Sequence, residues 1–203
     1  MRVLVACEFS GIVRDAFAAR GHDAWSCDLL PSEAPGHHYE GDVLGILDPA
    51  AVPMVGWQRW DLAIMHPSCT YLASSGERWF RNDARARPGV LIGEARRRER
   101  EKAIDFVKLL WGAPIERIAI ENPIGVLSTR WQKPSQIIQP WQFGHGEVKA
   151  TCLWLKGLPP LRPTQIVEGR TARVHRAPPG IDRWKERSRT LPGIAAAMAE
   201  QWG

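Results

Sequence analysis

Short apolar runs that end in polar residues, alternating with helical segments, are the feature that most constrains the fold. Runs of this kind are typical of strands that are buried on both faces of a parallel sheet. Val13–Arg20 and Gly93–Trp111 have the apolar spacing of helices, and Gly21 is suited to end the first of them. The alternation predicts an α/β fold with a mostly parallel sheet and helices on both faces. The strand-like segments are Arg2–Glu8, Asp23–Cys27, Asp61–Met65, Ile115–Ile120, Ser135–Gln139 and Thr151–Leu155.

Changes in composition along the chain predict three structural units. Residues 1–155 carry the alternating pattern and are expected to form the main domain. Residues 156–187 are rich in proline, glycine and arginine, which predicts a small, irregular, basic insertion. Residues 188–203 contain an amphipathic helix at Thr190–Trp202 that returns to the main domain. A further short helix is predicted at Asp48–Val55.

The composition excludes several classes of protein. The chain has 203 residues, of which 44% are hydrophobic and 24% charged, as in ordinary globular proteins. No apolar run is long enough to cross a membrane, and the apolar start is too short for a signal peptide. We therefore expect a cytoplasmic protein, and a monomer. The net charge of +5 suits a polyanionic partner. The ten tryptophans fit a compact core or a groove that stacks on bases equally well.

The cysteines and histidines do not predict a metal site. The four cysteines form no CxxC pair and have no zinc-finger spacing, so thiols are expected. Cys7, Cys27 and Cys152 lie in strand-like runs and are interpreted as core residues. His37 and His38 are adjacent in a loop, and without a third ligand they are expected to be solvated rather than metal-bound.

Cys69 is the first candidate for chemistry. It follows the Asp61–Met65 run and the turn residue Pro67, at the carboxyl end of a predicted strand. Ligands of open α/β sheets bind at these strand ends, so the thiol would face a crevice. The alternative is that Cys69 is a small buried side chain, as most free cysteines are.

Glu121 stands at the end of another predicted strand, Ile115–Ile120, and Asn122 and Pro123 follow it. If the two strands are neighbours, a carboxylate and a thiol meet over one crevice. The carboxylate would hold an N–H group of a substrate while the thiol attacks beside it. The alternative is that Glu121 caps a helix.

The first predicted strand is followed by Phe9-Ser10-Gly11, and the second ends at Asp28. A helix amino terminus after the glycine attracts anionic or polar ligand groups, and a carboxylate after the second strand can bind a ribose. There is no complete GxGxxG, so a dinucleotide site is not indicated. Asp28, and Asp42 in Gly41-Asp42-Val43, could equally be plain turn-forming residues.

Cationic and aromatic residues are interleaved in the long irregular stretch from Thr70 to Pro88. This pattern predicts a lid that contacts phosphates and bases, and the alternative is a solvated loop. The charged run from Arg96 to Lys102 is interpreted as the solvated face of its helix.

Taken in order, these segments resemble the DNA cytosine-5 methyltransferases, and in particular compact members of phages and prophages. Pro67-Ser68-Cys69-Thr70 resembles the Pro-Pro-Cys-Gln nucleophile motif, and Glu121-Asn122-Pro123 resembles Glu-Asn-Val. Phe9-Ser10-Gly11 is similar to the start of the Phe-x-Gly-x-Gly cofactor turn, with Val13 at the second glycine. Lys149 stands within the segment that carries Gln-x-Arg-x-Arg in the family.

The resemblance implies a Rossmann-like, S-adenosylmethionine-dependent methyltransferase fold, with residues 1–155 as the catalytic and cofactor-binding domain. The implied cofactor is S-adenosyl-L-methionine, and no metal is required. The implied cofactor contacts are Glu8, Phe9, Ser10, Gly11, Asp28, Leu29, Asp42, Val43 and Pro67.

The implied activity is methylation of cytosine at carbon 5 in DNA through a covalent Cys69 adduct, with the cytosine flipped out of the duplex. Glu121 would hold ring nitrogen 3 and the exocyclic amine. Lys149 would bind the base carbonyl or a phosphate, or would be merely solvated. The thiol must be ionised, which requires a cationic or helix-terminus environment. The expected DNA contacts are Arg78, Trp79, Arg81, Arg170 and Arg173.

One departure from the family leaves alternatives open. Only about thirty residues (156–187) fill the place of a sizeable target-recognition domain. Reading a sequence needs several base contacts, each worth roughly 1–3 kcal/mol, so short or relaxed specificity is expected. The alternatives are a methyltransferase for single-stranded DNA or a free cytosine nucleotide, and an inactive DNA-binding relative.

Overall fold

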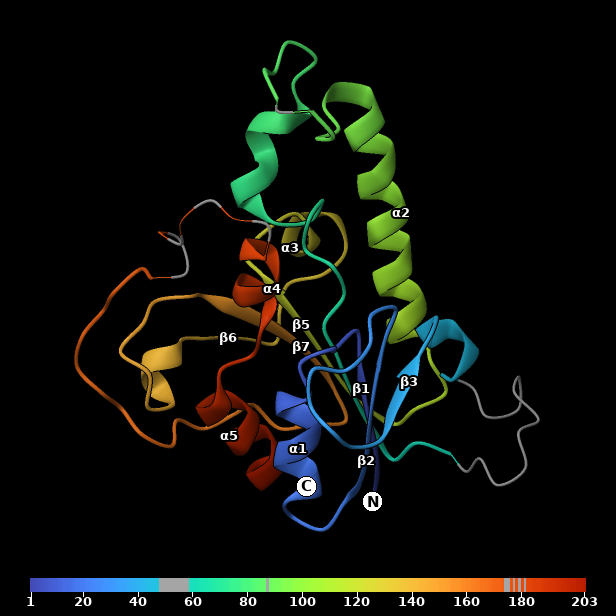
Figure 1. Ribbon diagram of the computed structural model, residues 1–203, viewed down its shortest axis with the longest axis vertical. Helices are drawn as coiled ribbons and strands as arrows, with labels where there is room; N and C mark the ends of the chain where they lie inside the picture. Colours follow the sequence, from blue (N-terminus) through green and yellow to red (C-terminus); the bar gives the residue numbers. More distant parts are fainter. Residues whose placement is uncertain (48–58, 87, 174–175, 177, 179, 181) are drawn as a thin grey trace.

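A computed structural model describes residues 1–47, 59–86, 88–173, 176, 178, 180 and 182–203. The helix predicted at Asp48–Val55 lies outside these residues. The core element is one seven-stranded sheet with the order β3-β2-β1-β4-β5-β7-β6 (Figure 1). Its strands are β1 (Arg2–Ala6), β2 (Asp23–Asp28), β3 (His38–Glu40), β4 (Leu62–Met65), β5 (Arg117–Pro123), β6 (Gln136–Ile138) and β7 (Thr151–Lys156).

The sheet is mostly parallel and Rossmann-like. β1 pairs in parallel with β2 on one side and with β4 on the other, so the strand order reverses at β1. β4 pairs in parallel with β5, whereas β7 runs antiparallel to both of its neighbours, β5 and β6. Open sheets of this kind bind ligands outside the carboxyl ends of the strands near such a reversal. The predicted fold class is confirmed.

Alternating side chains of the strands serve two separate cores. In β1, Leu4 and Ala6 face one core, and Val3 and Val5 face the other. The first core is covered by α2 (Gly93–Trp111) and α3 (Leu127–Arg130). The second is covered by α1 (Ile12–Ala18) and α5 (Pro192–Trp202), which pack against each other (Figure 1). Helices therefore cover both faces, as predicted.

Three of the tryptophans are buried in the packed core. Trp60, Trp154 and Trp202 are each at most 1% exposed. Their ring N–H groups donate to backbone carbonyl oxygens of Ile46, Gln132 and Pro159. These three side chains therefore belong to the core rather than to a base-stacking groove.

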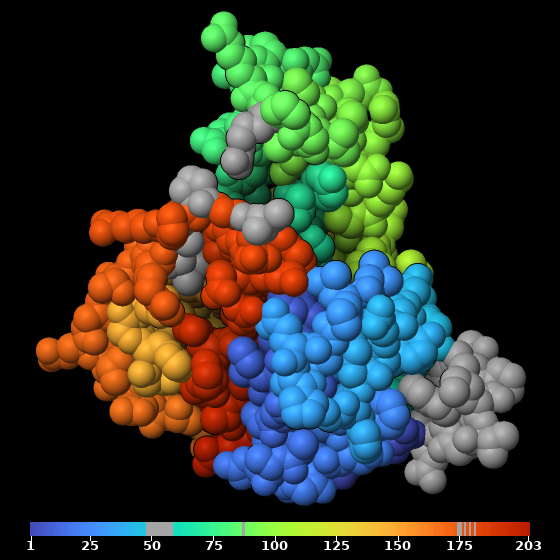
Figure 2. Space-filling model, in the orientation of Figure 1, coloured from blue at the N-terminus to red at the C-terminus, as the bar shows by residue number. Residues whose placement is uncertain are grey.

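Helix α2 extends past the sheet and carries a projecting arm. A 3-10 helix at Ser74–Phe80 packs against α2, and together they stand out from the body of the molecule (Figures 1 and 2). The stretch Thr70–Pro88 is therefore partly helical, which corrects the expectation of an irregular loop.

The interpretation of Arg96–Lys102 as a solvated face is wrong at two positions. Arg96 and Arg100 are only 5% and 9% exposed. The Arg100 guanidinium lies over the Phe80 ring at 3.3 Å and also bonds to Glu77. The arm supplies the aromatic and acidic partners that make burial of these cations possible.

One further segment differs from the predictions. The loop that contains His37 and His38 forms the edge strand β3 from His38 onward, in parallel with β2. His38 Nδ1 lies 2.8 Å from the Ser26 hydroxyl, so His38 is a structural residue rather than a solvated one.

The described part of residues 156–187 runs beside the segment before β7. It forms two isolated bridges, Phe143 with Gln165 and Glu147 with Thr171. The short helix α4 (Arg183–Ser188) follows and spans the boundary expected at residue 188. No described helix has the length and apolar character needed to cross a membrane.

Candidate active site

The carboxyl ends of β4 and β5 bring the two principal candidates onto adjacent strands. Met65 is paired with Ile120, so His66, directly after β4, lies beside Glu121, which is still within β5. His66 Nδ1 lies 3.3 Å from Glu121 Oε2. The buried Asn122 amide donates to the Pro67 carbonyl oxygen over 2.7 Å, which ties the turn after β4 to the end of β5. The predicted meeting of the two strand ends is therefore observed.

Cys69 lies on the turn that follows Pro67, and the residue is solvent-exposed. The turn is closed by Leu72 N–H and Ala73 N–H, which both donate to the Cys69 carbonyl oxygen, at 3.0 and 2.9 Å. Among the four free cysteines, Cys27 and Cys152 are buried and Cys7 is half-buried. The interpretation of Cys69 as a buried side chain is excluded, and it is the accessible thiol of the chain.

Three charged groups act on the Cys69 thiol. Partial desolvation by the surrounding protein raises the pKa of Cys69, and the negative charge of Glu121 raises it further. Lys149 and Arg187 act in the opposite direction. The net pKa of Cys69 in the free protein lies above its ordinary value, which differs from the cationic environment expected for a nucleophile.

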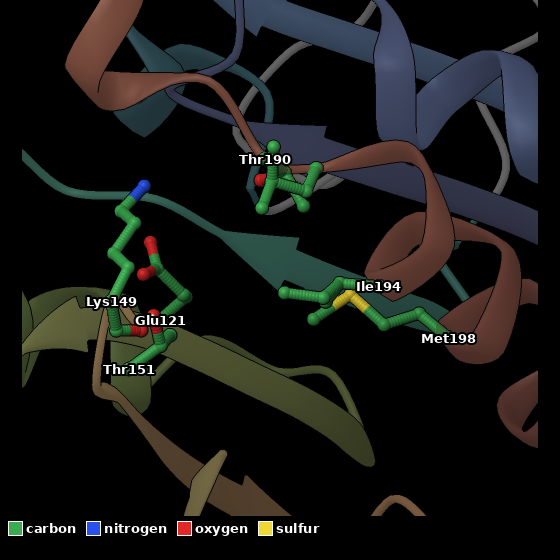
Figure 3. Close-up of a pocket in the computed structure, with 7 residues that line it drawn as sticks. Glu121, Lys149, Thr151, Thr190, Ile194 and Met198 are labelled. Carbon is green, nitrogen blue, oxygen red and sulfur yellow. Dashed lines mark hydrogen bonds between the residues drawn. The ribbon is translucent and has the colours of Figure 1, made fainter. Parts of the chain in front are cut away.

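Burial of Glu121 alone would raise the pKa of its carboxyl group. The hydrogen bond from His66 and the charge of Lys149 outweigh this effect, so the pKa lies below the usual value for glutamate. Glu121 is therefore an ionised acceptor. Figure 3 shows the Lys149 side chain alongside that of Glu121, with Thr190, Ile194 and Met198 on the opposite side of a small pocket.

The segment after Cys69 is held by arginines that sequence reasoning placed in solvent. Arg96 Nη2 donates to the Thr70 carbonyl oxygen at 2.6 Å, and Arg100 Nε donates to the Tyr71 carbonyl oxygen at 2.9 Å. Two buried guanidinium groups of α2 therefore fix the two residues that follow the thiol. The charged run in the sequence does not predict these contacts, because the aromatic side chains that pack on the two arginines come from a different segment.

The predicted opening of the α1 amino terminus to a ligand is wrong. Glu8 is 6% exposed, and its carboxylate accepts from Val13 N–H at 2.8 Å and from Arg14 N–H at 3.3 Å. Glu8 thus caps the helix and neutralises its positive end. Gly11 precedes α1 with a φ of 76°, a conformation that favours glycine.

The other expected cofactor contacts border the same edge of the sheet. Phe9 and Ser10 are nearly buried, Leu29 is 75% exposed, and Pro67 is buried. Asp28 accepts from Leu30 N–H, and Asp42 accepts from Leu44 N–H, next to the buried Val43. Both aspartates thus form local turns.

The chemistry of this edge suits a cationic cofactor better than a dinucleotide. Glu8, Asp28 and Asp42 are all carboxylates, and the helix N–H groups that would hold a pyrophosphate are occupied by Glu8. A sulfonium cofactor carries a positive charge and needs no phosphate site. The residues therefore fit S-adenosylmethionine. The described residues contain no cluster of three or more side chains suited to a metal ion.

Helix α4 covers part of this edge, which the sequence did not indicate. The Trp184 ring lies 5.9 Å from the Phe9 ring, at an angle of 57°. Arg189, directly after α4, pairs with Glu33 at 2.7 Å. The segment that connects α4 to α5 is thereby held over the site. The Lys149 ammonium also contacts this segment, because it donates to the Arg189 carbonyl oxygen at 3.3 Å.

The expected DNA contacts lie on two separate segments. Arg78 is exposed on the projecting arm with its guanidinium 4.4 Å from the half-buried Trp79 ring, and Arg81 pairs with Asp83 at 2.7 Å. In the basic segment, the Arg170 guanidinium lies 4.1 Å from the Trp141 ring. Arg173 Nε donates to Glu147 Oε1 at 3.0 Å, so part of its charge is already paired.

Comparisons with known proteins add little to these observations. No family model matches the chain, and no curated protein matches it either. Among solved structures, the chain is similar to a candidate DNA modification methyltransferase encoded within a prophage (E. coli), with 12% identity and a TM-score of 0.47. The alignment covers 89% of this chain and 56% of that chain, so this protein spans little more than half of that protein's length.

Proposed function

We propose that this protein transfers a methyl group from S-adenosylmethionine to carbon 5 of cytosine in DNA. The observation that carries the proposal is the pairing of β4 with β5, which sets an accessible thiol and an ionised carboxylate over one edge of the sheet. The motif resemblance at Cys69 and Glu121 supports the assignment of cytosine as the substrate base.

Cys69 is the proposed nucleophile. Carbon 5 of cytosine is a poor nucleophile until a thiolate adds at carbon 6. Protonation of ring nitrogen 3 makes carbon 6 electrophilic, and thiolate addition there pushes electrons toward carbon 5. The Glu121 carboxylate accepts hydrogen bonds from the N3–H group and from the exocyclic amine, and its negative charge favours the protonated ring. After the new bond at carbon 5 has formed, a base removes the proton there and the Cys69 sulfur departs.

His66 and Lys149 are proposed to prepare the carboxylate. The His66 Nδ1–H group donates to one oxygen of Glu121, which leaves the other oxygen for the substrate. Lys149 lies beside Glu121, its charge lowers the pKa of the carboxyl group, and it reaches the pocket from the segment before β7 (Figure 3). Its ammonium group is suited to bind the carbonyl oxygen of the base.

Residues at the ends of β1 and β2 are proposed to hold the cofactor. Asp28 and Asp42 would bind its hydroxyl and amino groups, and Phe9 with Leu29 would contact its apolar parts. When bound, S-adenosylmethionine supplies an electrophilic methyl group. The carboxylates of Glu8, Asp28 and Asp42 favour its positive charge.

The proposal is tested by tritium transfer from S-adenosylmethionine to duplex DNA, to single strands and to dCMP. We expect incorporation into duplex DNA, and none with Cys69→Ser. Cys152→Ser is the matched control, because that thiol is buried in the first core. Duplex incorporation that persists in Cys69→Ser would contradict the proposed nucleophile.

The same experiment separates the alternatives. The described residues between β7 and α4 form bridges but no large folded unit, which favours weak sequence discrimination. Incorporation only into single strands or dCMP would assign the enzyme to those substrates. Retained DNA binding without any incorporation would favour an inactive relative.

A further inference from the structure

Arg187 is a cation of the site that no motif predicted. It lies in α4, and its Nε atom is buried without a hydrogen-bond partner among the described residues. A buried donor that is left unpaired is unfavourable, and more so when it is charged. Among the described residues, His66, Arg96, Asn122 and Glu147 also carry a buried side-chain atom without a partner. On Arg187 the unpaired guanidinium N–H lies on a segment that borders the candidate site, where a ligand can take it up.

The neighbours of Arg187 fix its location at the site. Trp184 contacts Phe9 three residues before it, and Arg189 pairs with Glu33 two residues after it. Thr190 and Leu191, which follow immediately, line the pocket that contains Glu121. Arg187 is therefore held on a segment anchored at both ends, above the carboxyl edge of the sheet.

Arg187 and Lys149 approach the site from two different elements. Lys149 lines the pocket together with Glu121 (Figure 3), and the positive charges of Lys149 and Arg187 both act on the Cys69 thiol. The three charged groups that act on the thiol are thus Glu121 from β5, Lys149 from the segment before β7, and Arg187 from α4. Of these three groups two are cations and one is a carboxylate, and this balance around the thiol suits an anionic ligand.

We propose that Arg187 binds a phosphate of the target strand next to the reacting cytosine. This inference rests on the proposed function, and it identifies how the site recognises a nucleotide rather than a free base. In the usual anti conformation of a pyrimidine nucleotide, carbon 6 lies on the side of the 5′-phosphate. A cation beside the sulfur that attacks carbon 6 is therefore on the phosphate side, and a guanidinium matches the geometry of phosphate oxygens.

The test is the salt dependence of DNA binding by the full chain. Wild type, Arg187→Gln and Arg187→Lys are titrated against one fluorescent cytosine-containing 14-mer duplex between 50 and 200 mM salt. Loss of one phosphate contact should reduce the slope of log Kobs against log salt by about 0.9 and weaken binding several-fold regardless of sequence. Arg187→Lys should keep most of the slope, because it keeps the charge. Arg20→Gln is the matched control: it removes one exposed arginine paired with Glu200 at the end of α1, away from the site.

A second readout uses the accessible thiol. Arg187 lowers the pKa of Cys69, so Arg187→Gln should raise that pKa and slow alkylation of Cys69 near neutral pH, whereas Arg187→Lys and Arg20→Gln should not. An unchanged salt slope in Arg187→Gln, with wild-type DNA binding intact, overturns the inference and leaves the proposed function standing. Absence of DNA binding by the wild type overturns the inference together with the proposed substrate.

Discussion

Glu121→Gln should change two properties of the site in opposite directions. The glutamine keeps the size of the side chain but removes the negative charge that raises the pKa of the Cys69 thiol. The thiol should therefore ionise more readily in the variant. Methyl transfer should nevertheless fall, because the amide cannot balance the charge that develops on the cytosine ring.

The size of the effect follows from the exposure of the two groups. Two unit charges 4 Å apart interact by about 1 kcal/mol in water and about 4 kcal/mol at an effective dielectric constant of 20. The Glu121 side chain is 16% exposed, but Cys69 is an exposed residue, so screening favours the lower figure. About 1 kcal/mol corresponds to a roughly fivefold larger thiolate fraction at a pH below the pKa.

The assay is the rate of Cys69 alkylation by iodoacetamide at pH 7, followed by mass spectrometry of the peptide that contains Cys69. We expect a rise of about fivefold in Glu121→Gln, and a fall of about 10²–10³-fold in methyl transfer by the same variant. Glu116→Gln is the matched control, because Glu116 is exposed just before β5, at the opposite edge of the sheet. Unchanged or slower alkylation in Glu121→Gln would refute the arrangement of carboxylate and thiol.

Three further predictions concern the support of the site. Arg100→Ala should lower the free energy of unfolding by about 2 kcal/mol in urea titrations, because a buried charged hydrogen bond and its stacking on Phe80 are lost; a loss below 0.5 kcal/mol would mean that the arm is not anchored there. Gly125→Ala should cost about 1–3 kcal/mol in thermal unfolding, since its Cβ would overlap the Leu72 carbonyl oxygen; a stable variant would contradict this close approach. His66→Leu should raise the pKa of Glu121, because the hydrogen bond from His66 lowers it. A lowered carboxyl pKa stabilises the fold at pH values above the ordinary glutamate pKa, and this stabilisation is lost as the pH falls. The variant should therefore lose more stability at pH 7 than at pH 4, and an equal loss at both pH values would contradict the coupling.

The sheet and the two principal site residues could be predicted from the sequence. Apolar runs that are buried on both faces are local signals, and the parallel pairing of successive strands brings Cys69 and Glu121 to one edge. β3 could not be predicted, because His38–Glu40 forms an edge strand only through its pairing with β2.

The supporting residues depend on contacts between distant segments. Arg96 and Arg100 look like a solvated charge run, and only the packing of the arm against α2 buries them. Arg187 carries no motif, and its position depends on the docking of α4 on Phe9. The N–H groups at the start of α1 looked available because the sequence does not show that Glu8 turns back to cap them.

The central claim is that the Cys69 sulfur forms a bond with carbon 6 of a cytosine in DNA. It is tested most directly with a duplex that contains 5-fluorocytosine, incubated with the protein and S-adenosylmethionine. Fluorine at carbon 5 cannot leave as a proton does, so the adduct should accumulate. The account predicts a covalent protein–DNA complex whose crosslinked peptide contains Cys69 and which carries a methyl group. No complex, or a crosslink through another residue, would contradict it.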